Sequence, residues 1–255
     1  MRLALGITLL CAPVIRAQDS LAHAATGLDS RHSAHADSTT RDDRLMSRRT
    51  LWTISAFTIG AAAAVPFDRR WTHALQAPRF QDNRMLSRSA SLIRTIGDPG
   101  ALLLSGSVYA VGRLTRRDGL ADAGRHAGEA VLASGLVSLG IKTLVGRERP
   151  YADVRGNDAD EFMPGRGYRS DFASFPSGHT TVAFAAAAAF SGELARSHPR
   201  AGRVATPLFY TMATAVGVSR LYNNKHWASD AIIGAAVGTL VGRGVVSLAH
   251  RAVRR

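Results

Sequence analysis

The amino-acid sequence predicts an all-α protein, a bundle of about six core helices that is embedded in a membrane. Six apolar segments are long enough for helices, are rich in alanine and glycine, and lack the apolar–polar alternation typical of strands. Prolines lie near the segment boundaries, where helices begin or end. The segments cover residues 51–67, 99–113, 128–146, 180–195, 204–219 and 230–249, and the prolines are Pro66, Pro99, Pro150, Pro176 and Pro207.

The membrane prediction depends on the length of these segments. Residues 50–67 are free of charge and approach the ~20 apolar residues that a membrane span requires. The other segments have charge-free cores of roughly 12–16 residues, a length more typical of buried helices in soluble proteins. Small residues such as Ala186–Ala189, Gly234 and Gly238 suit close helix packing in lipid. We therefore expect a membrane protein, with a soluble protein as the alternative.

The N-terminus has the pattern of a secretory signal peptide. Met1 and Arg2 precede an apolar run that ends at Ile15, and Ala17 is the expected last residue removed. The alternative is an uncleaved membrane anchor. The one cysteine, Cys11, lies inside this segment, so cleavage leaves a chain without disulfides or a thiol nucleophile.

These features divide the chain into three parts. Residues 1–17 are the predicted signal peptide, and residues 18–50 are polar, without an apolar period, and predict a disordered linker. His32 and His35 within this linker are interpreted as part of a solvated tail rather than a metal site. Residues 51–255 form the predicted folded domain.

The chain is strongly basic, with a net charge of +13 that is nearly all arginine. Its only lysines are Lys142 and Lys225. Such a balance fits nucleic acid, an anionic membrane surface or phosphorylated substrates. No nucleic-acid motif with interleaved aromatic residues is present, which disfavours the first class of partner.

Three clusters of polar residues carry the candidate chemistry. Lys142 and Arg149 are seven residues apart, which is two turns of a helix, and Pro150 is expected to end that helix. Taken alone, this pair is no more than a basic helix end. The second cluster, Pro176-Ser177-Gly178-His179, precedes an apolar helix whose first amides can bind an anion, although a capped helix start explains it equally well.

The third cluster contains Ser219-Arg220 and, further along, His226 and Asp230. A spacing of four places the histidine and the aspartate side by side on a helix. A carboxylate bonded to one ring nitrogen fixes the tautomer and leaves the lone pair of the other nitrogen free. Taken alone, this pair is more typical of a structural hydrogen bond.

Together, the clusters resemble the three-part signature of the type 2 phosphatidic acid phosphatase (PAP2) family, which is related to bacterial non-specific acid phosphatases and vanadium haloperoxidases. The signature is a lysine with Arg-Pro seven residues on, then Pro-Ser-Gly-His, then Ser-Arg with a histidine six and an aspartate ten residues after the arginine. Every signature position is filled between Lys142 and Asp230.

The resemblance implies a metal-independent phosphatase of phosphomonoesters or pyrophosphates. It implies that His226 attacks phosphorus and becomes phosphorylated, that Asp230 orients it, and that His179 protonates the leaving oxygen and then activates water. Charge spreads over the equatorial oxygens in phosphoryl transfer, so catalysis depends on positioning and electrostatics. The phosphate-binding residues it implies are Lys142, Arg149, Ser177, Gly178 through its amide, and Arg220.

These residues predict no metal ligands and no cofactor, because the one carboxylate of the clusters is committed to a histidine. The expected substrates are membrane lipids of the phosphatidic acid, phosphatidylglycerol phosphate, isoprenyl diphosphate or lipid A class, and no obligate protein partner is implied. The expected location is the inner membrane of a bacterial-type cell envelope, multi-pass, with the site facing the periplasm. The alternatives are a soluble periplasmic acid phosphatase and a vanadium-dependent haloperoxidase. His73, His126, His198 and His250 belong to no cluster and receive no role.

Overall fold

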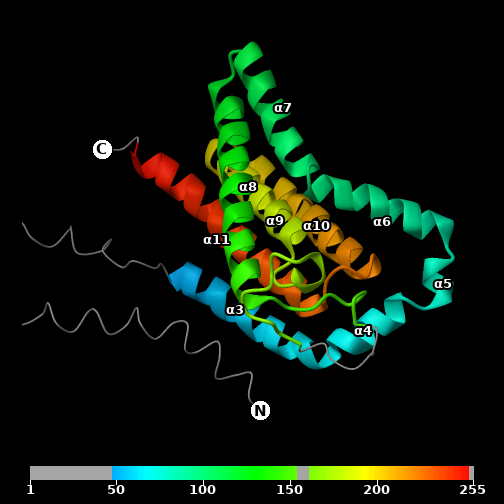
Figure 1. Cartoon of the computed structure of the whole chain (residues 1–255). Helices are drawn as coiled ribbons and strands as arrows, with labels where there is room; N and C mark the ends of the chain where they lie inside the picture. The colour runs from blue at the N-terminus through cyan, green and yellow to red at the C-terminus, as the bar shows by residue number, and fades with distance from the viewer. Residues whose placement is uncertain (1–47, 154–160, 253–255) are drawn as a thin grey trace, which may run out of the picture. The chain divides into compact units, whose positions relative to one another are not determined.

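The structure, a computed structural model, describes residues 48–153 and 161–252 (Figure 1). The predicted signal peptide and nearly all of the predicted linker lie outside these residues. Helices account for the fold, and the described residues contain no strand beyond one isolated bridge between Arg147 and Phe162. The all-α prediction is confirmed. The helices are α3 (Arg48–Ala64), α4 (Asp68–Leu75), α5 (Pro78–Gln81), α6 (Arg84–Gly97), α7 (Gly100–Leu114), α8 (Asp118–Val145), α9 (Gly178–Ser197), α10 (Pro199–Tyr222) and α11 (Ala228–Ala252), with short 3₁₀ turns η1 (Val65–Phe67) and η2 (Ser170–Phe172).

Each of the six predicted apolar segments lies in its own helix, namely α3, α7, α8, α9, α10 and α11. The prediction that prolines mark helix boundaries is wrong at Pro207, which lies inside α10. A proline can sit within a helix when neighbouring groups satisfy the freed carbonyl, at the cost of one backbone hydrogen bond. Helices α4, α5 and α6 were not among the predicted segments.

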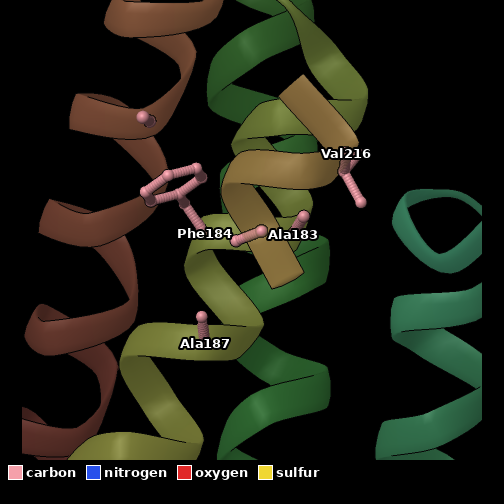
Figure 2. Close-up of a cluster of buried hydrophobic side chains, with 6 residues drawn as sticks. Ala183, Phe184, Ala187 and Val216 are labelled. Atoms are coloured by element: carbon pink, nitrogen blue, oxygen red, sulfur yellow. The ribbon is translucent and has the colours of Figure 1, made fainter. Parts of the chain in front are cut away.

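Helix α9 lies at the centre of the bundle and packs against α8, α10 and α11 (Figure 1). One core cluster joins Ala183, Phe184 and Ala187 of α9 to Val216 of α10 and Ala235 of α11 (Figure 2). The side chains that face this core are mostly alanine, so the helices approach closely. The helix order around α9 therefore places the starts of α9 and α11 beside the end of α8.

At two points of the contact between α9 and α11, backbone lies directly against backbone. A Cβ at Gly238 would meet the Thr181 carbonyl oxygen at 2.1 Å, and one at Gly242 would meet the Ala185 carbonyl oxygen at 2.5 Å. Small residues allow such close approach, which is common between helices in membranes. Gly238 was singled out in the sequence for this reason, and its packing fits the interpretation.

Three stretches are long and apolar enough to cross a membrane, judged by length and composition: Thr50–Leu75, Asp118–Val145 and Ala228–Arg251. The outward surface of α8 carries the exposed side chains Leu132, Leu136 and Leu139. A row of exposed leucines of this kind is unusual on a water-facing helix and fits contact with lipid. The membrane protein that the sequence predicted is therefore the better description of this fold.

Candidate active site

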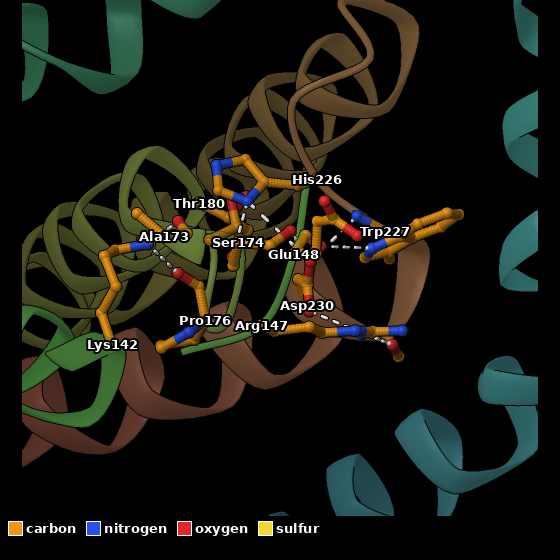
Figure 3. A network of polar contacts seen from close by, with 12 residues as sticks. Lys142, Arg147, Glu148, Ala173, Ser174, Pro176, Thr180, His226, Trp227 and Asp230 are labelled. Atoms are coloured by element: carbon orange, nitrogen blue, oxygen red, sulfur yellow. Dashed lines mark hydrogen bonds and ion pairs between the residues drawn. The ribbon is translucent and has the colours of Figure 1, made fainter. Parts of the chain in front are cut away.

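The three sequence clusters come together where α8 ends and where α9 and α11 begin. Figure 3 shows His226, Lys142 and Asp230 converging with the loop segment that contains Ser174 and Pro176. His226 is only 2% exposed and Asp230 is fully buried. The candidate site is therefore an enclosed polar centre at one end of the apolar bundle.

Lys142, in the last turn of α8, organises the loop that precedes α9. Its ammonium group donates hydrogen bonds to the carbonyl oxygens of Ala173 (2.5 Å) and Pro176 (2.8 Å). An ammonium has three hydrogens, so two go to these carbonyls and the third remains available to a substrate oxygen. Lys142 thus both shapes the loop and supplies positive charge.

The helix that carries Lys142 ends earlier than the sequence analysis expected. It ends at Val145 because Gly146 adopts a left-handed conformation with φ +59°, and the Gly146 amide donates to the Lys142 carbonyl. Glycine tolerates this conformation without steric cost. The prediction that Pro150 ends the helix is therefore wrong, and Arg149 lies in the following loop rather than on the helical face of Lys142.

His226 is held by a backbone carbonyl rather than directly by a carboxylate. Its Nδ1 lies 2.7 Å from the Ser174 carbonyl oxygen and 4.0 Å from Asp230 Oδ2. A carbonyl oxygen can only accept, so Nδ1 must carry the proton and the lone pair of Nε2 is free. The expected free nitrogen is present, but its hydrogen-bond partner differs from the one that the spacing suggested.

Asp230 acts one step further from the imidazole. Its Oδ2 accepts hydrogen bonds from the Ser174 hydroxyl (2.5 Å) and from the Trp227 amide (2.9 Å). It therefore fixes Ser174, whose carbonyl holds His226, and it also fixes the backbone next to His226. The His226–Asp230 pair is bridged because His226 precedes α11 and does not share its helical face.

Arg147 is a central residue of the site that sequence reasoning did not single out. Its side chain is 3% exposed and donates to Asp230 (2.7 Å), to the Ser229 hydroxyl (2.7 Å) and to Asp68 (2.9 Å). Asp68, at the start of α4, is fully buried and also accepts from the Ser229 amide and hydroxyl. This network joins α4 to α11 and neutralises the buried Asp230.

Arg149 and Arg220 have donor atoms that suit an anion. Within residues 48–153 and 161–252, the buried Nε of Arg149 and the buried Nε and Nη1 of Arg220 make no hydrogen bond to protein. Buried N–H groups without an acceptor are rare and costly. Guanidinium groups bind phosphate through paired N–H donors, so these atoms fit phosphate oxygens.

The electrostatics favour a neutral His226. Burial lowers the pKa of this imidazole well below its ordinary value near 6.5. The charges of Lys142, Arg149 and Arg220 lower it further, whereas the hydrogen bond to Ser174 acts in the opposite direction. A neutral imidazole is the nucleophilic form, so these surroundings keep His226 reactive at neutral pH.

His179 and its neighbours occupy the first turn of α9, outside the three candidate spans. Burial and, to a smaller extent, the charge of Arg220 lower the His179 pKa to about 4, with Asp98 opposing. The Ser177 hydroxyl is fully buried against the Thr180 hydroxyl at 2.8 Å, and Gly178 is the first residue of the helix. The structure thus brings all eight residues of the sequence signature to one centre.

Several residues near the site gave no recognisable signal in the sequence. Arg94 and Asp98, at the end of α6, act electrostatically on His179. A Cβ at Gly97 would meet the Val216 side chain at 2.8 Å and the His179 carbonyl at 3.1 Å, so α6 packs closely on the site. Lys225 lies 4.0 Å from the centre of the Tyr151 ring, so it contacts the segment that follows Arg149.

A solved structure shares this arrangement of helices. The chain is similar to the crystal structure of a transmembrane PAP2-type phosphatidylglycerolphosphate phosphatase from Bacillus subtilis, with a TM-score of 0.55 and 18% identity over 80% of this chain and 98% of that one. It is less similar to the structure of Aquifex aeolicus LpxE, with a TM-score of 0.45 and 17% identity over 65% of this chain and 87% of that chain. The first likeness supports the fold.

Sequence comparisons point to the same family. A stretch of 69 residues is 49% identical to the lipid A 1-phosphatase of Porphyromonas gingivalis. This match covers 27% of this chain and 15% of that relative's length. The profile of the PAP2 superfamily matches residues 123–254, just over half of the chain, and this range contains Lys142, His179, His226 and Asp230. With every signature residue gathered around one buried imidazole, this chain belongs to the PAP2 superfamily.

Proposed function

We propose that this PAP2-type phosphatase hydrolyses a phosphate group of a membrane lipid through a phosphohistidine on His226. The observation that carries the proposal is the hydrogen bond from His226 Nδ1 to the Ser174 carbonyl, which leaves Nε2 free near the cations Lys142, Arg149 and Arg220. In the first step, Nε2 attacks phosphorus and the bond to the leaving oxygen breaks. His179 gives a proton to that oxygen, then takes one from the water that cleaves the phosphorus–nitrogen bond.

The cations supply the electrostatic part of the mechanism. Arg149 and Arg220 have donor atoms without protein partners, and Lys142 has one hydrogen left for a phosphate oxygen. Fixed cations in a buried site stabilise the charge that develops on the transferred phosphoryl group. Asp230 is occupied by Arg147, Ser174 and Trp227, so it has little capacity left to hold a divalent metal.

The phosphohistidine is tested by trapping it. The wild type is mixed with a lipid phosphate labelled with ³²P and quenched in alkali, in which phosphohistidine is stable. We expect label on the wild type and none on His226→Gln. His179→Gln should accumulate more label than the wild type when the leaving group needs no proton, as with nitrophenyl phosphate, because its second step lacks a base. Full turnover by His226→Gln would rule out the mechanism.

An apolar groove supports a lipid rather than a soluble ester. It has a volume of about 590 Å³, lies between α6 and α10, and reaches Ser219, the residue before Arg220. An acyl chain in this groove would place its phosphate at the cationic centre. The apolar side chains that line it include Leu86, Ile93, Tyr210, Ala215, Val218 and Tyr222.

The groove is tested with a series of lipid phosphates of increasing chain length. Each buried methylene adds ~0.8 kcal/mol, about a fourfold gain in kcat/KM until the groove is filled. Ala215→Trp should remove this gain and leave the hydrolysis of short esters unchanged. Leu103→Trp, on the exposed surface of α7, is the matched control and should keep it. A wild type that does not discriminate chain length would favour the soluble acid-phosphatase alternative.

We also propose that the chain crosses the inner membrane several times with its site facing the periplasm. The three candidate spans support the crossing. Because Cys11 is the only cysteine, single cysteines can be introduced on a Cys11→Ala background and labelled with a membrane-impermeant maleimide in cells with a permeabilised outer membrane. Tyr168→Cys, beside the site, should react and Arg200→Cys, at the other end of the bundle, should not. The reverse pattern would place the site in the cytoplasm.

A further inference from the structure

A second group of ionisable side chains lies at the end of the bundle opposite the catalytic loops. His126 is in the third turn of α8, Glu193 is near the end of α9, and His250 is in the last turn of α11. The same helices carry catalytic residues at their other ends, ~24 Å away along α8 at 1.5 Å per residue. This group is therefore separate from the phosphatase centre.

The three side chains converge on one point. Glu193 Oε1 lies 2.7 Å from His126 Nδ1 and 2.9 Å from His250 Nε2, and Glu193 Oε2 lies 3.0 Å from the latter. The three potential ligand atoms all lie within 4.8 Å of one another. His126 and Glu193 are buried, with 2% and 7% exposure. Within residues 48–153 and 161–252, this is the one group of its kind.

We propose that His126, Glu193 and His250 bind a divalent transition-metal ion, with Zn²⁺ as the favoured ion, and that this ion joins α8, α9 and α11. Two imidazoles and one carboxylate are borderline ligands that suit Zn²⁺, and three protein ligands leave a fourth position for water. The proposal departs from the sequence-based expectation that the chain holds no metal. That expectation considered the catalytic clusters, where no ligand set is available.

The spacing of the ligand atoms is close to what the ion needs. Metal–ligand bonds of ~2.0–2.1 Å in a tetrahedral site place the ligand atoms ~3.3–3.4 Å apart. The present contacts of 2.7–3.0 Å therefore have to open by about 0.5 Å. A change of this size calls for a small side-chain adjustment at each ligand, and the ligand atoms of His126 and His250 already lie within 4.8 Å of each other.

Arg125 competes with the ion for His126. Its Nη2 lies 2.9 Å from His126 Nε2. Arginine can only donate, so this nitrogen accepts and the proton resides on Nδ1, directed at Glu193. Metal binding through Nδ1 moves the proton to Nε2, and Arg125 must turn away. It can do so because it is half-exposed and already contacts Asp122 (3.3 Å) and Glu129 (4.0 Å).

The cluster also lies where ionisable side chains are uncommon. His126 and His250 lie within two of the candidate membrane spans. Ionisable side chains are rare within such segments, and where they occur they mark sites for ions, protons or ligands. The proposed phosphatase mechanism does not use this polar centre.

The test measures zinc bound to the full-length protein in detergent. After treatment with EDTA and its removal, Zn²⁺ is added in competition with a chromophoric chelator. We expect one tight site per chain and a rise in Tm on binding. The double variant His126→Gln/His250→Gln should lose this site, with at least ~100-fold weaker affinity. The variant His73→Gln/His198→Gln, which removes two histidines outside the cluster, should keep it.

Arg125→Ala provides a test that leaves all three ligands in place. Removing its positive charge and its hydrogen bond to His126 should strengthen zinc binding severalfold. This variant decides the question even if the double histidine variant fails to fold. Equal zinc binding by wild type and the double variant would overturn the proposal, as would unchanged affinity in Arg125→Ala. Either result would show that the cluster is a set of structural hydrogen bonds only.

Discussion

Asp230 and His226 are linked through Ser174, whose hydroxyl donates a hydrogen bond to the carboxylate and whose carbonyl oxygen accepts one from the imidazole. The carboxylate itself lies 4.0 Å from Nδ1. Asp230 therefore positions His226, the proposed nucleophile, through the loop backbone. If His226 is the nucleophile, the hydroxyl of Ser174, a residue outside the family signature, contributes to the reaction.

Ser174→Ala should lower kcat while leaving KM nearly unchanged. The substitution keeps the carbonyl that binds His226 but removes the bond that fixes it, and it leaves Asp230 with one partner fewer. A buried acceptor that loses a partner costs about 1–3 kcal/mol, which corresponds to a fall in kcat of roughly 5- to 150-fold. Steady-state kinetics on one lipid phosphate measure this. A direct action of Asp230 on His226 would instead leave kcat untouched.

Arg147→Met should destabilise the protein strongly. It leaves Asp68 and Asp230 buried without their shared cation, and breaking a buried pair in this way costs about 3–5 kcal/mol. Unfolding in detergent, followed by circular dichroism, measures the loss. Arg113→Met is the control, because its ion pair with Asp118 is exposed and is worth about 0–1 kcal/mol. Similar stabilities for the two variants would contradict this role of Arg147.

Gly146→Ala should reduce both stability and activity. The new Cβ would lie 1.9 Å from the Met163 carbonyl oxygen, in a left-handed conformation at φ +59°, which alone costs about 1–2 kcal/mol. The loop that carries Arg149 would have to shift. Gly140→Ala, in the interior of α8 with nothing within 4 Å of its Cβ, should be neutral or slightly stabilising. Activity and Tm of both variants, measured in parallel, decide the matter.

Stability should fall as the pH decreases from about 6.5 toward about 4. The folded protein holds the His179 pKa at about 4, mainly by burial, whereas an unfolded histidine titrates near 6.5. The unfolded chain therefore binds more protons in this window, so acid favours unfolding, and the stabilisation is fully present above pH 6.5. His179→Gln should reduce the slope of Tm against pH. Glu129→Gln, on the exposed face of α8, should not alter it.

The lowered pKa of His179 also has a consequence for catalysis. A histidine with a pKa of about 4 is neutral in the free protein at pH 7, so His179 can act as an acid only after its pKa rises. A bound phosphate dianion supplies the negative charge that would raise it. ¹³C-labelled histidine spectra should show a higher His179 pKa when vanadate is bound than when it is absent.

Much of this architecture was predictable from the sequence, because α3 and α7–α11 are apolar enough to be recognised one segment at a time. Helix α6 was not, since it is amphipathic, with three arginines, and its packing on α10 depends on tertiary contacts. The signature residues were predictable because their spacing is local. Asp68 was not predictable, because it meets Ser229 across 161 positions of the chain.

The sequence also could not distinguish residues of the same type that have different roles. Arg147 and Arg149 are two positions apart and identical in kind, yet one is buried between carboxylates and the other has a free donor. Both follow the left-handed turn at Gly146, and the contacts that separate their roles are made with distant parts of the chain. His126 and His250 gave no signal for a similar reason, because Glu193 lies 67 and 57 residues away from them.

Two glycines of α11 determine how precisely α9 and α11 are spaced at the active site. Gly238 and Gly242 bring the α11 backbone onto the carbonyls of Thr181 and Ala185 in α9. Side chains can rotate to absorb a misfit, but backbone in contact with backbone cannot. The distance between α9, which carries His179, and α11, which carries Asp230, is therefore fixed by glycines that lie two to three turns along α11 from Asp230.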